Sequence, residues 1–208
     1  MRYYRLGALL YAELFAYSVC HDGVVVSKPR LWQAPGGSSI IQNGSPWAGQ
    51  EDDCTHFISS CVGATINLKF ANQTIVCGGG LPVGWQSSAP NFAKFLVNNG
   101  IALIVKKPEN KHEIKFWPTL STVNVNRPSN VPHPETVDAI RTNLNRGDLI
   151  AYSSQDTSKN APEQWADHYE HFAILTSETG IACHTHSRFN VQFSEIGWPF
   201  VTLLKIVV

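Results

Sequence analysis

Cys54 is the residue of this chain whose type and position are best suited to chemistry. It lies in the first turn of a short helix that the sequence predicts over residues 53–63, with Gly63 as its stop. The unpaired amide hydrogens and the positive end of the helix dipole favour a thiolate there, and the thiolate is the nucleophilic form of cysteine. The alternative interpretation is a buried structural cysteine.

Asp53 directly precedes Cys54 and affects what the thiol can do. A carboxylate that pointed at the sulfur would raise the pKa of the thiol and oppose formation of the thiolate. Asp is also a preferred N-cap residue of helices. We therefore expect the Asp53 carboxylate to cap the helix and to point toward the backbone amides rather than toward the sulfur.

Histidines that could act as a base toward this thiol lie in the C-terminal part of the chain. His171 belongs to a stretch over residues 169–176 that predicts a strand. A tight turn leads into a second predicted strand over residues 181–187, which carries His184 and His186. A histidine base whose second nitrogen is oriented by another imidazole would fit such a pair of strands.

The geometry of these histidines depends on how the two strands pair. If Thr176 pairs with Ile181, His171 lies opposite His186, and the imidazole of His184 shares the same face of the sheet. A register that differs by one residue would move His184 and His186 to the other face. The first register is our expectation.

The same region has a rival interpretation as a metal site. Five of its side chains are potential zinc ligands: His168, His171, Cys183, His184 and His186. Their spacing is unlike that of a closed structural zinc site, and no second pair of cysteines accompanies them. We therefore expect neither a metal nor another cofactor.

The remaining histidines are not expected to take part in catalysis. His56 lies two residues after Cys54, and helix positions at that offset point in different directions. His21, His112 and His133 fit surface or core positions without a chemical role.

Helices that precede strands are expected to position the reactive groups. The predicted helices cover residues 3–18, 53–63, 90–99 and 134–144, and the predicted strands lie within 64–80 and over 101–105, 113–117, 148–153, 169–176, 181–187 and 200–207. Leu6, Leu10, Leu14 and Tyr17 recur at helical spacing and indicate the first of these helices. Helices followed by antiparallel strands predict an α+β fold.

Composition indicates one domain over residues 1–208 and excludes several classes of function. Of the 208 residues 43% are hydrophobic, which is enough for one core. The 16 basic and 16 acidic residues give a net charge of zero, so the basic stripe of a nucleic-acid-binding protein is missing. No apolar run is long enough to span a bilayer, so we expect no membrane insertion.

The N-terminal segment and the cysteines bear on where the protein works. The first residues imitate a signal peptide, but Glu13 interrupts the apolar region and no small-x-small cleavage site precedes Cys20. We therefore expect any export to use a route without a cleaved leader. The five cysteines are Cys20, Cys54, Cys61, Cys77 and Cys183. They fit one working thiol with up to two disulfides, or five reduced and mostly buried thiols.

Several segments of the chain together resemble a known family. Asp53-Cys-Thr-His-Phe-Ile-Ser-Ser-Cys61 resembles the Asp-Cys-Thr-Asn-Phe-Val-Ser-Gln signature of the bacterial putative amidase domain family, which is related to the NlpC/P60 and CHAP cysteine peptidases. Residues 4–12 resemble the opening helix of that family. Its Gly-Asp strand, its catalytic-histidine strand and the segment that follows resemble Gly147-Asp-Leu-Ile-Ala-Tyr152, His171-Phe-Ala-Ile-Leu-Thr176 and His184-Thr-His-Ser-Arg188.

The resemblance implies a fold and a set of catalytic residues. The fold is a papain-like, NlpC/P60-type one, with N-terminal helices packed on an antiparallel β-sheet or partial barrel. The resemblance also implies Cys54 as nucleophile, His171 as general base and acid, and His184 as the third, orienting residue. The thiolate would attack an amide carbonyl, His171 would protonate the departing amine, and water would release the acyl-enzyme. The Cys54 backbone amide would be one oxyanion donor.

The resemblance further implies a substrate and a setting. Relatives of this kind commonly cut peptide cross-bridges of bacterial cell walls, so peptidoglycan peptides are the expected substrate. The protein would be a monomeric antibacterial effector or a lysin, secreted or delivered to the periplasm or cell wall of a target cell, with an immunity protein as a partner.

Two departures from the family pattern leave the substrate open. His56 replaces the usual Asn, and residues 64–80 and 101–133 do not align, so these stretches are expected to be specificity insertions. The alternatives are a papain-fold deamidase or acyltransferase that acts on protein or lipid, and a non-enzymatic module whose His and Cys side chains bind a metal.

Overall fold

The structure is a computed structural model of the chain. It describes residues 1–18, 20–22, 53–70, 72–84, 86, 88–106, 116–120, 131–155, 164–184 and 188–208. The helices in these ranges are α1 (Arg5–Phe15), α2 (Asp53–Gly63), α3 (Ala89–Asn98), α4 (Pro134–Asn143) and a short 3-10 helix, η2 (Phe193–Ile196). The strands are β1 (Ile66–Phe70), β2 (Gln73–Cys77), β3 (Ala102–Ile104), β4 (Trp117–Pro118), β5 (Leu149–Ser153), β6 (Tyr169–Leu175), β7 (Gly180–Cys183), β8 (Arg188–Gln192) and β9 (Phe200–Ile206). The fold is α+β, as the sequence predicted, and each of the four expected α-helices is present.

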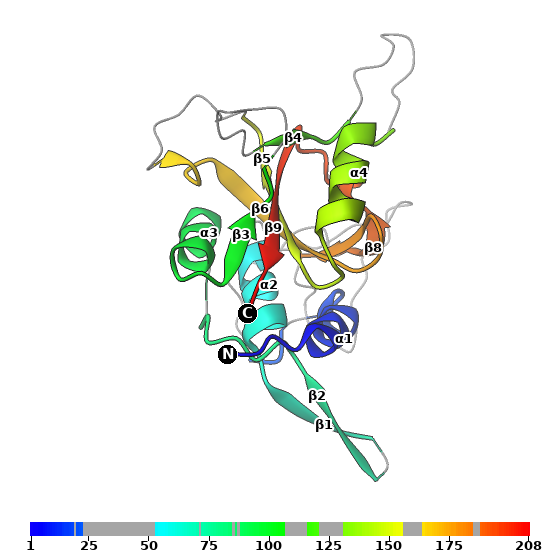
Figure 1. The fold of residues 1–208 in the computed structure, drawn as a ribbon. Coiled ribbons are helices and arrows are strands. Elements are labelled where there is room, and N and C mark those ends of the chain that lie inside the picture. Colours follow the sequence, from blue (N-terminus) through cyan, green and yellow to red (C-terminus); the bar gives the residue numbers. More distant parts are fainter. Residues whose placement is uncertain are drawn as a thin grey trace.

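The strands form one large antiparallel sheet and one separate hairpin. The large sheet has seven strands in the order β3-β9-β5-β6-β7-β8, and β4 pairs with a further part of β9. The hairpin of β1 and β2 extends away from the body of the molecule (Figure 1). The sequence did not predict β8, in which Asn190 has a φ of 55° that interrupts the extended backbone.

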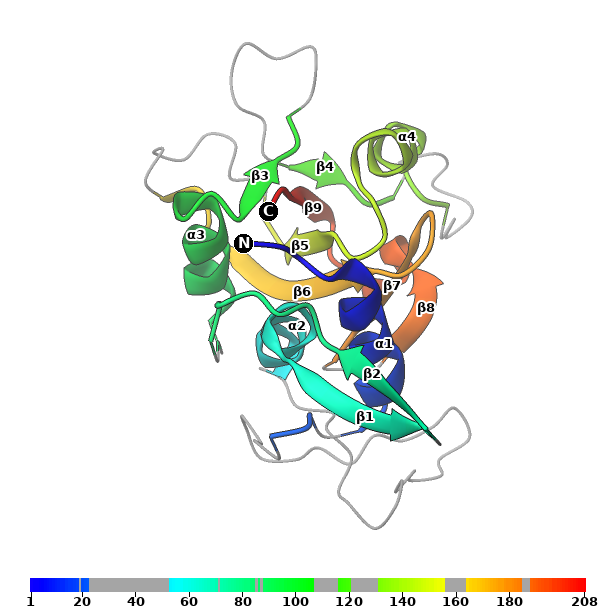
Figure 2. The same ribbon diagram turned by 60° about the horizontal axis from the view of Figure 1, so that its bottom comes forward.

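Helices cover both faces of the central strands. Figure 2 shows α1, α2 and α3 on one side of β5 and β6 and α4 on the other. On the first side Phe57 of α2 and Phe92 of α3 belong to the same core as Phe172 of β6. On the second side Ile140 of α4 packs in a core with Tyr152 of β5. Successive residues of β5 and β6 therefore point into different cores.

Helix α1 packs through Tyr11 and through several of its smallest residues. Ala8 and Ala12 are fully buried, whereas Leu6, which belongs to the apolar repeat that indicated this helix, is 67% exposed. Gly7 allows the closest approach, because a Cβ there would lie 2.3 Å from the carbonyl oxygen of Gly78. The helix lies where the sequence predicts it. Its packed face is not the predicted one but the face where the backbone of α1 approaches that of Gly78.

Asp148 connects two of the segments that resemble the amidase family. Its buried carboxylate accepts hydrogen bonds from the Arg5 guanidinium at 2.6 Å and from the backbone amides of Asn145 at 2.7 Å and Ile206 at 2.9 Å. Arg5 also donates to the carbonyl oxygen of Ile206. These bonds tie the start of α1 to β5 and β9. Arg5 of the opening helix and Asp148 of the Gly-Asp segment therefore hold the fold together.

We expect Asp148→Asn to lower the free energy of unfolding by about 3 kcal/mol, because it removes the charge partner of Arg5 and leaves buried amides poorly matched. Urea unfolding followed by circular dichroism measures the loss. Arg141→Gln is the control, since Arg141 pairs with Glu178 through side chains that are 53% and 77% exposed, and its loss should cost less than about 1 kcal/mol. Equal losses for both variants would contradict this role of Asp148.

The pairing of β6 with β7 differs from the predicted register by one residue. Ile174 pairs with Ala182 and Leu175 pairs with Ile181, whereas the sequence analysis paired Thr176 with Ile181. The turn between the strands includes Thr176, so each residue of β7 faces a residue of β6 one position earlier than predicted. Side chains of β7 that were expected on one face of the sheet therefore lie on the other. The expectation that His171 and His184 share one face of the sheet is therefore wrong.

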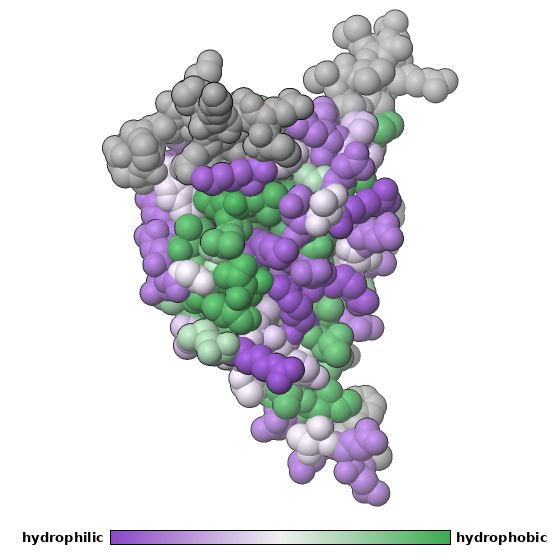
Figure 3. All heavy atoms as spheres, in the orientation of Figure 1, coloured by the Kyte–Doolittle hydropathy of each residue, from purple (hydrophilic) through white to green (hydrophobic). Residues whose placement is uncertain are grey.

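Hydrophobic side chains also reach the surface near the outer edge of the sheet. Figure 3 shows a hydrophobic area on the face that carries α3 and β3 in Figure 1. Leu103 of edge strand β3 is 57% exposed, and Val207, which follows β9, is 45% exposed. The residues expected to be catalytic do not contribute to this surface, because Cys54, His171 and His184 are all buried.

Candidate active site

Cys54 lies in the first turn of α2, which packs on β6 and β7. The side chain is buried, and its Sγ lies 3.9 Å from the carbonyl oxygen of Glu170 and 3.7 Å from the hydroxyl oxygen of Thr55. The thiol thus faces the backbone of β6 one residue before His171. It stands at the amino end of a helix, where the amide hydrogens and the helix dipole favour negative charge.

His171 lies on β6 directly after a β-bulge. Glu170 is the extra residue of the bulge, opposite the step from Tyr152 to Ser153 of β5. The imidazole contacts the edge of the Tyr152 ring at a centroid distance of 5.6 Å, on the sheet face that α4 covers. Its buried Nε2 has no hydrogen-bond partner in the described residues. No hydrogen bond joins this ring to Cys54 in that part of the chain.

His184 follows β7 and lies on the opposite face, against α2. Its ring stacks on the Phe57 ring with centroids 3.9 Å apart. Nε2 donates a hydrogen bond to the carbonyl oxygen of Phe15 at 2.7 Å, and Nδ1 is hydrogen-bonded to a carboxylate oxygen of Asp53. Both ring nitrogens are therefore engaged. The structure brings His184 to the residue beside Cys54 and not to His171.

Asp53 lies between two imidazoles. Its Oδ2 bonds His184, and its Oδ1 lies 2.9 Å from Nδ1 of His56. The second nitrogen of His56, Nε2, lies 2.9 Å from Oδ2 of Asp22. The sequence analysis expected the Asp53 carboxylate to cap α2, but both of its oxygens are bound to histidine rings. The reason is that buried carboxylates and imidazoles satisfy each other more strongly than neutral amides can.

These hydrogen bonds control the ionisation of His56 and Asp53. Burial lowers the pKa of His56, but hydrogen bonds with Asp53, Cys20 and Asp22 outweigh burial and raise the pKa to about 10. For Asp53, burial raises the pKa, and the hydrogen bonds from His184 and His56 reverse this and hold it below the usual 3.8. The two residues therefore form a charged pair at neutral pH.

The raised pKa of His56 makes the stability of the fold depend on pH. A group with a higher pKa in the folded state contributes stability that is complete below its unfolded pKa of 6.5 and is lost as the pH rises through about 10. We expect the free energy of unfolding to fall over this range, and His56→Gln to make the fall smaller. Urea unfolding at a series of pH values measures both slopes.

His21→Gln is the matched control for this slope. His21 bonds the Tyr11 hydroxyl at 2.7 Å and does not contact Asp53, so the variant should keep the slope of the wild type. A slope that His56→Gln leaves unchanged would contradict the assignment of the charge to His56.

Cys20 belongs to the same buried cluster. Its Sγ, a carboxylate oxygen of Asp53 and a ring nitrogen of His184 lie within 4.8 Å of one another, so the three could hold a metal ion. The rival metal interpretation of the sequence, which we did not favour, named a different set of ligands. Two of those, Cys183 and His184, lie in different cores, and His186 lies outside the described residues. All five cysteines are free thiols.

Sequence reasoning missed the contribution of the N-terminal segment to this site. Tyr11, Cys20 and Asp22 reach the cluster through hydrogen bonds to His21 or His56. They lie more than thirty residues before α2 in the sequence and form no recognisable spacing with it. The helical offset of two residues directs His56 away from Cys54. That direction is the one in which Asp53 and Asp22 lie.

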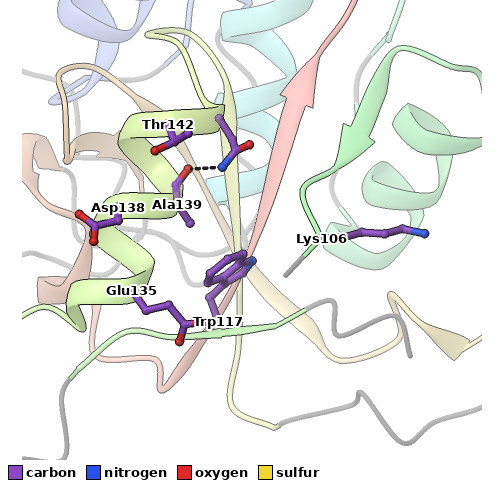
Figure 4. Close-up of a pocket in the computed structure, with 7 residues that line it drawn as sticks. Lys106, Trp117, Glu135, Asp138, Ala139 and Thr142 are labelled. Carbon is purple, nitrogen blue, oxygen red and sulfur yellow. Dashed lines mark hydrogen bonds between the residues drawn. The ribbon is translucent and has the colours of Figure 1, made fainter. Parts of the chain in front are cut away.

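A pocket on the α4 side of the sheet is separate from this cluster. Its volume is about 320 Å³. Figure 4 shows residues that line it, which come from α4, from Trp117 and from Lys106. The lining residues are Lys106, Trp117, Glu135, Asp138, Ala139, Thr142 and Asn143. None of the expected catalytic residues lines it, so the candidate active site is the region around Cys54.

A comparison with protein families identifies the family of the chain. The family model described as a putative amidase domain matches residues 2–202. No curated protein and no solved structure matches the chain. Of the helices in the described residues, none has both the length and the apolar character needed to cross a membrane.

Proposed function

The chain belongs to the putative amidase domain family, and from this premise we propose that it is a cysteine hydrolase with Cys54 as its nucleophile. Membership of the family indicates hydrolysis of amide bonds. The observation that carries the choice of nucleophile is the placement of Cys54 in the first turn of α2, with its Sγ 3.9 Å from the peptide that leads into His171. A helix start stabilises the thiolate that such a reaction requires.

His171 is the proposed general base and acid. A base needs a ring nitrogen that is free to accept a proton, and both nitrogens of His56 and of His184 are engaged. The buried Nε2 of His171 has no partner in the described residues. Hydrogen bonds between catalytic groups often form only in the substrate complex. We propose that substrate binding changes the backbone at the Glu170 bulge, so that the His171 ring turns toward Cys54 and contacts its thiol.

The proposed reaction has two stages. His171 takes the thiol proton, and the Cys54 thiolate attacks the amide carbonyl while the Cys54 backbone amide donates to the oxyanion. The imidazolium of His171 then gives its proton to the departing amine. Water, deprotonated by the same imidazole, attacks the thioester and releases the acid product and the free thiol. His184 acts through Asp53, which it holds at the start of α2.

The proposed substrates are the peptides of bacterial peptidoglycan, in which the enzyme would cleave amide bonds. The protein would have a papain-like, NlpC/P60-type fold. It would act as an antibacterial effector or a lysin in the cell wall or periplasm. Resemblance to wall-cleaving cysteine peptidases supports this proposal. In the effector case an immunity protein would be its partner.

Digestion of purified sacculi tests the proposal. Intact sacculi are incubated with the wild type and with Cys54→Ala, and the released muropeptides are identified by mass spectrometry. New amide-bond ends that only the wild type produces are the expected result, and their position names the bond. A parallel reaction with EDTA should proceed at the same rate. If zinc restored an activity that EDTA had removed, the metal-binding alternative would replace the thiol mechanism.

A further inference from the structure

The carboxylate of Asp53 is a difficulty for a nucleophile at position 54. It belongs to the adjacent residue in the same helical turn, and only 2% of Asp53 is exposed. Water therefore screens its charge poorly. A negative charge that close disfavours a second one, so an uncompensated Asp53 would oppose formation of the Cys54 thiolate.

The structure shows how this charge is compensated. His56 lies 2.9 Å from one oxygen of Asp53, His184 bonds the other, and both histidines are fully buried. The Cys20 Sγ lies within 4.8 Å of this carboxylate, and the two imidazoles are its side-chain hydrogen-bond partners in the described part of the chain. The two rings therefore hold it from both sides, and its direction is set by α2 and β7 together.

The outer nitrogens of the two rings indicate their charge. Nε2 of His56 faces a carboxylate oxygen of Asp22, and Nε2 of His184 faces the carbonyl oxygen of Phe15. All four ring nitrogens of the pair thus face oxygen acceptors, and an oxygen acceptor requires an N–H donor. An imidazole that donates from both nitrogens is an imidazolium, so the geometry suits two cationic rings around Asp53.

We propose that His56 and His184 are positioning residues that neutralise Asp53 and hold its carboxylate away from the Cys54 thiol, so that the thiolate can form at the start of α2. The proposal rests on Cys54 being the nucleophile, as proposed above. It adds His56 to the working residues of the site and gives His184 a partner other than His171.

The other titratable groups near Asp53 and Cys54 do not supply this compensation. Tyr11 of α1 and Cys20 are neutral when protonated, and burial raises the pKa of both. Asp22 adds a negative charge that His56 also binds. On β6 the carboxylate of Glu170 is bonded to the hydroxyl of Ser154 at 2.8 Å and to its amide at 3.0 Å, and His171 faces the other side of the sheet.

Alkylation of Cys54 as a function of pH tests the proposal. Iodoacetamide reacts with the thiolate, and peptide mass spectrometry of the full-length protein reports the rate at Cys54 alone. We expect His56→Gln and His184→Gln each to move the midpoint of this reaction up by about one pH unit, which makes alkylation about tenfold slower at neutral pH. His21→Gln, which removes an imidazole that contacts Tyr11 and not Asp53, should keep the midpoint of the wild type.

A double variant separates charge from a general loss of structure. Asp53→Asn combined with His56→Gln removes the carboxylate together with its partner, so the midpoint should return to within a few tenths of a unit of the wild-type value. Damage to the fold would persist in the double variant. The double variant therefore also gives a result if His56→Gln alone folds poorly.

Three results would overturn the proposal. One is an unchanged midpoint in both single variants, and another is a double variant that stays as slow as His56→Gln. The third is stoichiometric zinc in the purified wild type that is lost in Cys20→Ser, because a cation would then neutralise Asp53. Failure of the proposed function looks different, since Cys54→Ala would then still hydrolyse sacculi whatever the alkylation midpoints.

Discussion

Replacing Cys54 by alanine is expected to lower the rate of amide hydrolysis by about 10⁴-fold or more, because the proposed reaction has no route without the thiolate. The thiol lies at the start of α2 against the carbonyl oxygen of Glu170, and no other cysteine occupies the first turn of a helix in the described residues. Release of muropeptides from sacculi, followed over time by mass spectrometry, measures the loss.

Cys61→Ala is the matched control for this variant. Cys61 lies on the same helix, is fully buried and undergoes the same substitution. Both variants should lose about 1 kcal/mol of stability, since each removes one buried sulfur atom. Activity should survive in Cys61→Ala alone. Equal activities of the two variants would show that the sulfur of Cys54 does no chemistry and would leave it as a core residue.

Replacing His171 by glutamine is expected to lower kcat by about 10²- to 10⁴-fold, with a smaller effect on KM. The loss follows because His171 both removes the thiol proton and protonates the leaving amine in the proposed reaction. The variant should also lose the part of the pH–rate profile that reports an imidazole. Steady-state kinetics on a soluble peptide fragment of the substrate, measured across a range of pH, gives both quantities.

His168→Gln is the control for this histidine. His168 lies three residues earlier, just before β6, and was a ligand candidate only in the metal interpretation. Its loss should leave kcat within about twofold of the wild type, the usual size of effects away from the reacting groups. If His184→Gln lowered kcat more than His171→Gln did, His184 would be the base, and its bond to Asp53 would have to open during the reaction.

Whether His171→Gln or His184→Gln lowers kcat more also tests how well a family resemblance assigns catalytic roles to residues. The signature around Cys54 and the family match agree on an amidase. The resemblance also implies that His184 orients His171, whereas the ring of His184 contacts Asp53 and Phe15. A role assigned through alignment assumes that aligned side chains face the same way, and a one-residue change of register removes that assumption.

Much of this protein could be predicted from its sequence by itself. The four α-helices and the strands near residues 148–153, 169–176, 181–187 and 200–207 follow from local signals, namely caps, stop glycines and the spacing of apolar residues. The same signals placed Cys54 in the first turn of a helix. These features depend on residues within one or two turns of each other, so they can be read without knowing the fold.

The tertiary structure alone decided how the candidate site is assembled. The pairing of Leu175 with Ile181 put His171 and His184 on opposite faces, although the sequence fits the neighbouring register almost as well. The contacts of Asp53 join α2 to His184, 131 residues away in the chain. Such contacts leave no local pattern in the sequence. They depend on how whole helices and strands pack, and on the energetic cost of burying a charge without an opposite charge beside it.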